Sequence, residues 1–463
     1  MSTTGVDRAA LGRAASGRAA SGRDFDFIIV GGGVTAAAMA SLLVARKLAA
    51  PGRVAIVADR LSPPAAATTI PEADWDLRVF ALSRASQRLL TVCGAWQLLP
   101  PDKLCAYERM CVWESHGVYT HGVYTHGVAL GLGSLSFDSA ELGEPNLGFI
   151  VEGRALHMQC RRAASAAGVV FIEAGIAGIV VDQPHVRIRL NDGREIQSAL
   201  LIAADGADSP TRKLLGIETA GHAYHQDALV AHVRTEKSHR HTAWQRFLPT
   251  GPLAFLPLPD GRSSIVWSAL HAEAARLRSL DAAGFGAALT AASGEFLGSC
   301  ELTTPVASFP LKLQYAVDYV RPRAVLLGDA AHAVHPLAGQ GLNLGLLDCA
   351  ALADVLSGAG GDAGCFGEPK LLRRYERWRR SENLLAAAAM DGLERLFSSD
   401  NPAVARLRFA GLDAVGRMPF VKRRLAMRAL GLSGDIPAFL KADPEPSVDF
   451  GPATGAGRVS PRR

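Results

Sequence analysis

Short apolar runs that end at a glycine or an acid recur along the chain and predict buried strands. They cover residues 27–30, 53–58, 198–204 and 324–327. An Ala-rich segment at 34–48 follows the first run and predicts a helix. Strands alternating with helices indicate an α/β fold.

The first βα unit carries a glycine-rich turn. Residues 27–45 are 19 positions without a charge, enough to span a membrane as one helix. Gly31-Gly-Gly33 breaks this stretch, so it predicts a strand and a packed helix instead. Gly31 permits the tight turn, Gly33 lets the backbone approach a pyrophosphate, and Ala36 takes the third small position of the dinucleotide fingerprint.

Charged residues stand at or near the ends of the other strands. Asp59 could bind an adenosine ribose, although it lies 28 residues after Gly31, and a shorter alignment would put the preceding alanine in its place. Asp205-Gly206 can hold the pyrophosphate side of a dinucleotide. Arg78 precedes an apolar segment, so we interpret it as a partly buried residue near phosphate or a flat ring, with a plain surface arginine as the alternative.

The stretch from Val325 to Gly345 combines a strand, Asp329, a Pro-Gly-rich turn and a helix that begins near residue 340. Gly339 and Gly341 would let a flat ligand lie against bare backbone, with the helix N-terminus pointing N–H groups at it. Such a turn suits a ring whose edge becomes anionic on reduction.

Residues 217–305 alternate short strands with turns and one helix at 282–292, and predict a second, β-sheet domain. Its large aromatic residues could line an apolar pocket or simply fill the core, and the core is the default for each alone. These residues are Trp244, Phe247, Phe255 and Trp267.

Helices are predicted at 342–356, 370–397 and 406–432. The last one mixes apolar residues with a basic set that could rest on an anionic membrane, or be a solvated face packed on its own domain. That basic set is Arg406, Arg408, Arg417, Lys422, Arg423, Arg424 and Arg428.

Composition excludes several classes of protein. The 463 residues suggest two or three domains, and 49% apolar with 20% charged residues is typical of a globular protein. The net charge is +5, of which the first 23 residues give 4 − 1 = +3, so no folded basic surface for nucleic acid is indicated. Seven scattered cysteines without a C-x-x-C pair predict neither a metal site nor a disulfide framework.

Three segments predict little regular structure. Residues 1–23 and 446–463 are expected to be disordered tails, and the first could alternatively be an organellar transit peptide. Residues 116–130 repeat His-Gly-Val-Tyr-Thr, which indicates a tandem duplication in a loop rather than a histidine metal site.

Three motifs in order carry a family resemblance: Gly31-x-Gly33-x-x-Ala36, Asp205-Gly206, and Gly328-Asp-Ala-Ala-His332 with the segment 336–343. This order resembles the single-component FAD aromatic hydroxylases related to para-hydroxybenzoate hydroxylase. Segments 78–82, 148–152, 243–253 and 335–345 resemble most closely the branch that acts in ubiquinone biosynthesis. The resemblance covers roughly residues 24 to 445.

The resemblance implies a set of FAD-binding residues. The glycine turn and Asp59 would hold the ADP part, Arg154 and Asp205 would lie near the pyrophosphate and ribityl chain, and Asp329 would bind a ribityl hydroxyl. Backbone N–H groups of 341–343 would cradle the flavin ring. The full set is Gly31, Gly33, Ala36, Asp59, Arg78, Arg154, Asp205, Gly206, Asp329, Gly339, Gly341, Leu342 and Asn343.

The implied reaction is reduction of the flavin by NAD(P)H or an electron-transfer partner, addition of O2, and oxygen transfer to an electron-rich ring. No metal is required. His335 is the candidate base for the phenol, with an ordinary loop histidine as the alternative, and Pro336 joins the four aromatic residues as a candidate pocket residue.

The expected fold is therefore α/β (α+β overall): a Rossmann-like FAD-binding domain with an inserted β-sheet substrate domain and C-terminal helices. The expected substrate is a polyprenylated phenol or quinol; a soluble small phenol, or a non-catalytic prenyl-lipid binding or scaffold protein, are the alternatives. Other pathway proteins and a membrane surface are possible partners. We expect a cytoplasmic enzyme, with a peripheral position on the inner membrane as an alternative, or a mitochondrial enzyme only if residues 1–23 are a transit peptide. The expected divisions are 24–95 with 146–216 and 306–398 for FAD, 96–145 with 217–305 for substrate, and 399–445 for the C-terminal helices.

Overall fold

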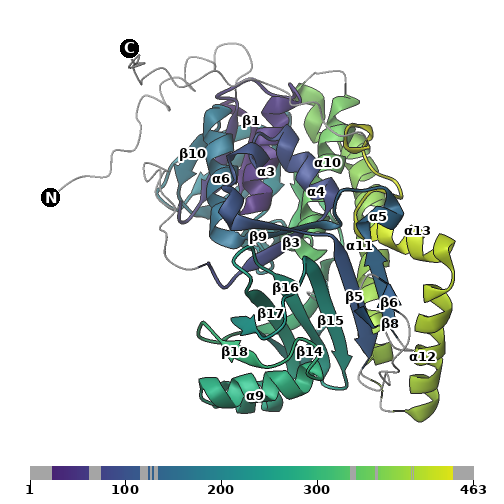
Figure 1. Cartoon of the computed structure of the whole chain (residues 1–463). Helices are drawn as coiled ribbons and strands as arrows, with labels where there is room; N and C mark the ends of the chain where they lie inside the picture. The colour runs from purple at the N-terminus through teal and green to yellow at the C-terminus, as the bar shows by residue number, and fades with distance from the viewer. Residues whose placement is uncertain are drawn as a thin grey trace, which may run out of the picture.

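Two β-sheets lie one above the other, and helices cover the upper one (Figure 1). The computed structural model describes residues 23–61, 75–114, 124–125, 128–129, 134–333, 340–359, 363–397, 399 and 401–441. Residues 1–22 of the first predicted tail, the whole second tail, and most of the His-Gly-Val-Tyr-Thr repeat with its three histidines lie outside these residues. The predicted mixed α/β fold is confirmed.

The upper sheet has eight strands, and five of them run parallel. The parallel strands are β10 (Val170–Glu173), β2 (Val54–Ala58), β1 (Phe25–Val30), β13 (Glu195–Ala203) and β21 (Ala324–Leu326), with β20 (Val320–Arg321) beside β21. The antiparallel pair β12 (His185–Leu190) and β11 (Ile176–Asp182) extends the sheet from β13. All five parallel strands therefore bring their carboxyl ends to one edge, where α/β sheets bind ligands.

Side chains alternate between the two faces of this sheet. On β1, Phe27 and Ile29 pack in the core under the helices, whereas Ile28 and Val30 pack on residues of β11 and β12. The covering helices are α3 (Val34–Ala45), α6 (Gly153–Ala166) and α10 (Gln340–Ser357). The charge-free residues 27–45 are thus a buried strand and helix, as predicted. No helix of the described residues is long and apolar enough to cross a membrane.

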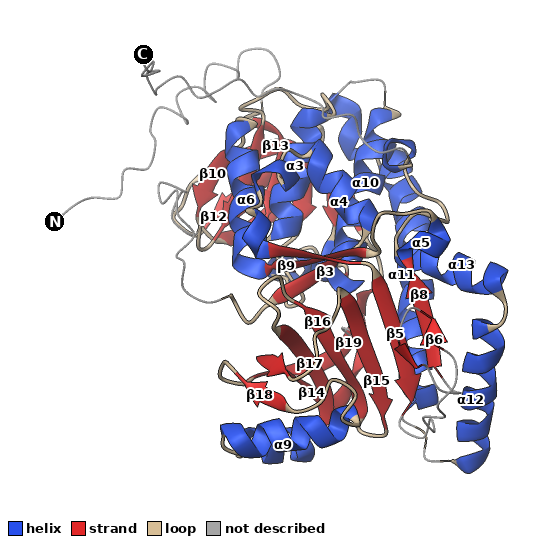
Figure 2. Cartoon of the chain, in the orientation of Figure 1, coloured by secondary structure: helices blue, strands red, loops and turns tan. Residues whose placement is uncertain are grey.

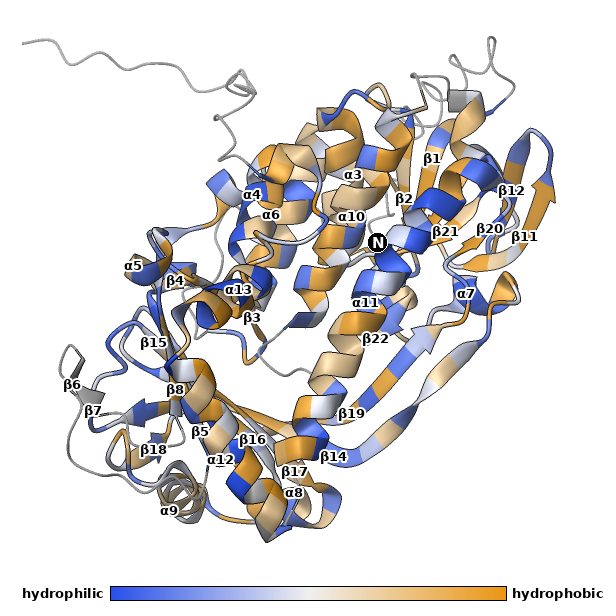
Figure 3. Cartoon of the chain, turned by 90° about the vertical axis from the view of Figure 1, so that its right-hand side faces the viewer, coloured by the Kyte–Doolittle hydropathy of each residue, from blue (hydrophilic) through white to orange (hydrophobic). Residues whose placement is uncertain are grey.

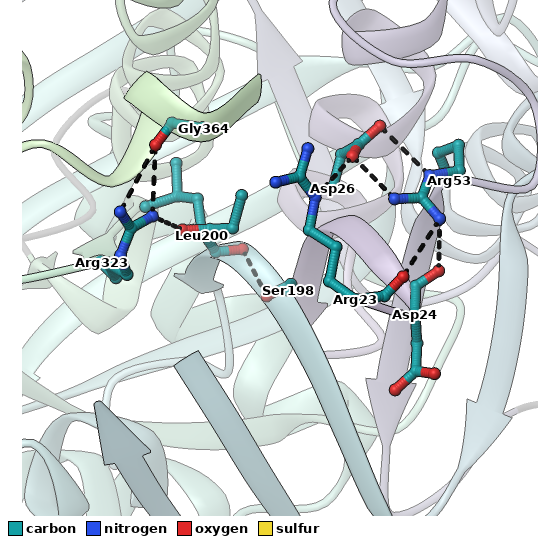
Figure 4. Close-up of polar contacts among 9 residues, drawn as sticks. Arg23, Asp24, Asp26, Arg53, Ser198, Leu200, Arg323 and Gly364 are labelled. Atoms are coloured by element: carbon teal, nitrogen blue, oxygen red, sulfur yellow. Dashed lines mark hydrogen bonds and ion pairs between the residues drawn. The ribbon is translucent and has the colours of Figure 1, made fainter. Parts of the chain in front are cut away.

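Arginines tie together the opposite, amino-terminal edge of the parallel strands (Figure 4). The carboxylate of Asp26 on β1 pairs with Arg53 at 3.0 Å and with Arg23 at 3.1 Å. Arg323, which precedes β21, donates to the Ala199 carbonyl on β13 at 3.0 Å. These contacts fix the strand register at one edge and leave the carboxyl edge free for a ligand.

The lower sheet has nine strands and is largely antiparallel. Its strands are β22 (His332–Ala333), β19 (Ala307–Ala316), β14 (Thr219–Thr235), β17 (Ser263–Leu270), β16 (Gly251–Pro257), β15 (Thr242–Leu248), β5 (Arg109–Glu114) and β8 (Ser134–Asp138), with β18 (Cys300–Leu302) on β14. Helices α8 (His271–Arg278) and α9 (Ala282–Ser293) pack on the outer face of this sheet. β19 pairs with β14 here, although the predicted division assigned residues from 306 onward to the FAD-binding domain.

A small three-stranded sheet lies between the two large ones (Figure 2). It pairs β3 (Val79–Leu82), β9 (Gly148–Glu152) and β4 (Leu104–Tyr107). The remaining short elements are α4 (Arg84–Val92), α5 (Ser139–Leu142), α7 (Pro210–Leu214), β6 (Tyr124–Thr125), β7 (Val128–Ala129), and the 3-10 turns η1 (Trp96–Leu98), η2 (Pro101–Lys103), η3 (Gly328–Ala330), η5 (Ala363–Gly367) and η6 (Ala438–Leu440).

Three helices end the described chain: α11 (Pro369–Phe397), α12 (Pro402–Gly416) and α13 (Pro419–Ala429). The segment predicted to be helical at 406–432 forms two helices: α12 ends at Gly416, and α13 begins at Pro419, whose ring cannot continue a helix from the previous turn. A buried ion pair fastens α12: Arg408 donates to Glu114 of β5 at 2.7 Å.

Candidate active site

A cavity of about 1280 Å³ separates the carboxyl edge of the upper sheet from the inner face of the lower sheet. Small-molecule sites commonly occupy about 300–1,000 Å³, so this cavity has room for a dinucleotide and a second ligand. Its walls come from the strand-end turns of the upper sheet, the first turns of α6 and α10, the three-stranded sheet, and strands β5, β14 to β17 and β19.

The glycine turn after β1 forms one end of the cavity. Gly31 has φ +127°, and a Cβ on it would lie 2.2 Å from the Ala204 carbonyl oxygen, so only glycine fits there. At Gly33 a Cβ would meet nothing within 4 Å, because that side opens to the cavity. Helix α3 begins directly after Gly33 without a side-chain cap, which leaves its first N–H groups free for an anion.

Ala36 lies one turn into α3 and is fully buried in the core. It therefore packs helix on strand, as the fingerprint requires, and does not line the cavity.

Exposed charges of both signs line the cavity around this turn. Asp59 follows β2 directly, and Arg154 lies in the first turn of α6, 3.4 Å from the buried carboxylate of Glu152. Arg78 precedes β3 and places its guanidinium carbon 5.0 Å from the centre of the Phe80 ring. Both arginines line the cavity, and guanidinium groups are strong hydrogen-bond donors to phosphate oxygens.

Asp205 shapes the turn after β13. One carboxylate oxygen accepts from Ser209 Oγ and the other from the backbone N–H of Thr211 at 3.0 Å. Both oxygens are thus engaged in holding the entry to α7, and Gly206, at φ +86°, turns the backbone along the cavity.

Asp329 lies on a turn that a hydrogen bond to the buried Asp348 holds in place on the side away from the cavity. Its side chain is exposed to the cavity, while the N–H of the preceding residue, Gly328, donates to the buried Asp348 of α10 at 3.0 Å. Asp348 also accepts from His332 at 2.6 Å and from Arg379 of α11 at 2.7 Å. This network fixes the turn that presents Asp329.

Asp348 is ionised in this network. Burial alone would raise the pKa of its carboxyl group, but the charges of His332 and Arg379 and the hydrogen bonds from both hold that pKa well below its usual value. The carboxylate and the guanidinium of Arg379 thus neutralise each other inside the protein.

The N-terminus of α10 forms the opposite end of the cavity. Gly341 and Leu342 line it, and a Cβ on Gly341 would meet nothing within 4 Å. Asn343 is buried: its side-chain oxygen accepts from Ser83 N at 2.9 Å and Ser86 Oγ at 2.6 Å, and its Nδ2 donates to Ala81 O at 2.8 Å. Its side chain therefore fixes the helix start to the β3–α4 connection and does not line the cavity.

The lower sheet closes the cavity mainly with small and aliphatic side chains, and Gln245, Ser268 and Phe309 also line it. Ala228 and Val230 of β14, Ala254 and Leu256 of β16, and Val266 of β17 line it. Their neighbours along each strand point to the opposite face and belong to the core under α8 and α9.

This alternation corrects most of the predicted substrate-pocket residues. Phe255 and Trp267 lie in the core on the opposite face, and Phe247 stacks on Phe397 of α11 with ring centres 3.8 Å apart, so none of the three lines the cavity. Trp244 borders the cavity, although its side chain is buried and packs in the same core. Pro336, His335 and Gly339 lie outside the described residues.

Comparison with known proteins identifies the family. A model described as an FAD binding domain matches residues 162–388. The chain is 37% identical over 423 residues to "Ubiquinone hydroxylase UbiL" of Rhodospirillum rubrum, which covers 91% of each chain. It is 33% identical over 411 residues to "3-demethoxyubiquinol 3-hydroxylase" of Escherichia coli, with 88% of this chain and 98% of the relative covered. The chain belongs to the FAD-dependent ubiquinone hydroxylases.

A human mitochondrial member, "Ubiquinone biosynthesis monooxygenase COQ6", is 33% identical over 446 residues and covers 87% of this chain and 91% of its own. Among solved structures, p-nitrophenol 4-monooxygenase PnpA from Pseudomonas putida has a TM-score of 0.65 at 16% identity, covering 87% of this chain and 97% of its own. At that identity the likeness shows the fold alone. The predicted family, the monooxygenase class and FAD as cofactor are confirmed.

The cavity fits FAD on the chemistry of its own residues. Bare backbone at Gly33 and Gly341 opens at its two ends, where a diphosphate and a flat ring can approach closely. Arg78, Arg154, Asp59 and Asp329 line the cavity between them, where the arginines would supply cations for a diphosphate and the carboxylates would accept from ribose and ribityl hydroxyls. In these hydroxylases the bound FAD supplies the activation of O2.

Two residues of this site, the half-buried His157 and the buried Asp348, were not predicted from the sequence. His157 of α6 borders the cavity, and its Nε2 donates to the Gly32 carbonyl at 2.5 Å, which steadies the glycine turn. Asp348 is an acid within the otherwise apolar run 344–353, and that isolation is a sequence signal for a buried polar network.

Proposed function

We propose that this enzyme hydroxylates the aromatic ring of a polyprenylated phenol or quinol in ubiquinone biosynthesis. The observation that carries the proposal is the contrast between the two sides of one continuous cavity. One side presents glycine backbone, carboxylates and arginines, and the other presents Ala228, Val230, Ala254, Leu256 and Val266.

The apolar side suits a substrate that is itself apolar. Among the described residues of the lower sheet that line the cavity, none is a carboxylate, lysine, arginine or histidine. Tyr107 of the three-stranded sheet borders it, and burial raises the pKa of this phenol to about 12, so it remains neutral. These residues exclude water and orient a ring, while oxygen activation belongs to the cofactor.

The reductant is NAD(P)H or an electron-transfer partner, and O2 is the co-substrate. A polyprenyl chain partitions into lipid, so the proposed substrate brings the enzyme to the cytoplasmic or matrix face of an inner membrane, near other proteins of the pathway.

Oxygen incorporation tests the proposal. The FAD-loaded protein is supplied with reductant, 18O2 and a polyprenylated phenol in detergent, and the product is analysed by mass spectrometry. We expect one 18O atom in the ring, and a higher kcat/KM than for the same phenol without its chain. Reduced flavin that re-oxidises without 18O in the product would reject the hydroxylation, and equal kcat/KM for both phenols would reject the prenylated substrate.

Asp329→Ala tests the site itself. Loss of the carboxylate should strip FAD from the folded protein, and unchanged flavin occupancy would reject its predicted role.

A further inference from the structure

Helices α12 and α13 lie on the side of the molecule that faces the viewer in Figure 3, and an apolar stripe of exposed residues runs along them. Exposed residues follow each other at helical spacing on α12 and continue onto α13. Leu407 is 69% exposed and Phe420 is 75% exposed. We call this set the α12–α13 face: Ala403, Leu407, Ala410, Gly411, Ala414, Met418, Phe420 and Leu425.

Exposed arginines flank the stripe; among them, Arg428 pairs with Glu382 of α11 at 2.7 Å and Arg423 donates to the Glu141 carbonyl at 3.4 Å. Asp413 is the only acid in the sequences of both helices, and it is paired with Arg417 at 2.9 Å. The exposed basic residues of α12 and α13 and the turn between them are Arg406, Arg417, Arg423, Arg424 and Arg428. Large apolar side chains bordered by exposed arginines are the composition of a helix that lies in a lipid–water interface.

We propose that the α12–α13 face docks on an anionic phospholipid surface. Leu407, Met418 and Phe420 would enter the acyl–headgroup boundary, and the arginines would contact lipid phosphates. Charge favours this occupant over a second copy of the chain, which would bring like-charged arginines together. The proposal rests on the proposed function for its purpose, since a prenylated substrate resides in the same bilayer.

The inner side of α13 connects this face to the active site. Ala426 and Leu430 pack in a small apolar cluster with Leu142 and Leu147, and Tyr107 and Met110 pack against that cluster. Tyr107 and Met110 also line the cavity. One layer of apolar side chains therefore separates the helix on the bilayer from the cavity, which keeps a bound prenyl chain close to the membrane.

The position of the face is fixed by buried contacts. Arg408 on the inner side of α12 pairs with Glu114 and donates to the carbonyls of Leu396 and Ser399, at the end of α11. Leu412 packs against Phe247 and Phe397. Substitutions on the exposed side leave all these contacts in place.

Vesicle co-sedimentation of the FAD-loaded full chain tests the proposal. Vesicles of phosphatidylcholine alone are compared with vesicles containing 30% phosphatidylglycerol. We expect binding to the anionic vesicles that falls at least tenfold in Leu407→Ser/Phe420→Ser. Arg423→Gln/Arg424→Gln should lose roughly fivefold per charge removed. Matched controls elsewhere on the surface, Val180→Ser/Leu270→Ser and Arg276→Gln/Arg278→Gln, should bind as the wild type does.

Wild-type protein that ignores anionic vesicles, or face variants that bind as well as their controls, would overturn the proposal. So would a dimer that Leu407→Ser/Phe420→Ser converts to monomer without change in vesicle binding, because a second copy would then cover the face. Turnover of a prenylated phenol in detergent is measured beside these assays. Vesicle binding without turnover would count against the proposed function alone, and turnover without vesicle binding would count against the docking face alone.

Discussion

The carboxylate of Asp348 accepts a hydrogen bond of 3.0 Å from the backbone N–H of Gly328, one residue before the exposed Asp329. Asp348 is completely buried, whereas Asp329 faces the cavity. Helix α10 thus controls the turn that is predicted to bind the ribityl chain, although Asp348 itself does not reach the cavity. Asp348 is a positioning residue, and its substitution should affect both the fold and the cofactor.

Asp348→Asn should weaken FAD binding by about tenfold or more and destabilise the protein. The substitution leaves the buried Arg379 without its counter-charge, and breaking a buried pair in this way costs about 3–5 kcal/mol. Flavin fluorescence titration gives the affinity and urea unfolding gives the free energy. The matched control is Asp354→Asn, on the same helix but partly exposed, which should change neither. Wild-type FAD affinity in folded Asp348→Asn would contradict the positioning role.

Gly341→Ala should have opposite effects on stability and on cofactor binding. A Cβ meets no protein atom within 4 Å there, and alanine favours a helix over glycine by up to about 1 kcal/mol, so the FAD-free protein should become more stable. The same Cβ enters the space that the flavin needs, so FAD affinity should fall.

Gly392→Ala is the control for that substitution. It too lies in a helix, α11, with nothing within 4 Å of its Cβ, but outside the cavity. Thermal unfolding of the FAD-free proteins should show a gain in both variants. A fall in FAD affinity in both, or in neither, would argue against a flavin bed at Gly341.

The strand ends and turns of this site follow from sequence because parallel strands place their carboxyl ends at one edge. Gly31, Asp59, Asp205 and Asp329 lie far apart in the chain, yet each directly follows a parallel strand or lies within three residues of its end, and all four line the cavity. The local sequence pattern was sufficient to predict these cavity residues, since each of them stands at or near the end of a recognisable strand.

The substrate side could not be read in the same way. One face of the lower sheet lines the cavity and the other packs against α8 and α9, so both faces carry apolar residues. Alternate residues of each strand point to opposite faces, and the sequence alone does not say which of the two sets faces the ligand. The larger Phe255 and Trp267 suggested a pocket, but the fold places the smaller Ala254 and Val266 there.

His157→Gln should remove part of the pH dependence of stability. Burial, aided by the charges of Arg161 and Arg78, lowers the pKa of His157 against the opposing hydrogen bond to Gly32. In the unfolded chain the pKa of this histidine is about 6.5, so below that pH the unfolded chain binds more protons than the folded protein. The contribution of His157 to the unfolding free energy is therefore fully present above about pH 6.5 and is lost as the pH falls below it. The difference in unfolding free energy between wild type and variant should therefore grow from about pH 5 to about pH 7 and then stay level.

His239→Gln provides the comparison for His157. Burial also lowers the pKa of His239, whose Nε2 bonds the Leu258 carbonyl at 3.1 Å outside the cavity lining. Its variant should show the same sign of pH dependence in urea unfolding without a change in FAD affinity. His157→Gln should change both, because its partner lies in the glycine turn; a pH-independent difference would disprove the role of burial.

Arg408→Met should destabilise the protein far more than the loss of a surface ion pair. Glu114 would remain buried without a counter-charge, and the carbonyls at the end of α11 would lose their donor, so we expect a loss of about 3–5 kcal/mol. Arg187→Met, which removes an exposed pair with Asp182, should cost at most about 1 kcal/mol. Urea unfolding compares the two.

The double variant Glu114→Leu/Arg408→Met separates charge from packing. If the cost of Arg408→Met comes from the stranded carboxylate of Glu114, replacing that carboxylate should recover most of the lost free energy. If it comes instead from the uncapped carbonyls of Leu396 and Ser399, the double variant should unfold as easily as the single one. The first outcome would mean that charge neutralisation between Arg408 and Glu114 holds α12 on β5. The second would mean that the hydrogen bonds from Arg408 to the carbonyls at the end of α11 hold α12 in place.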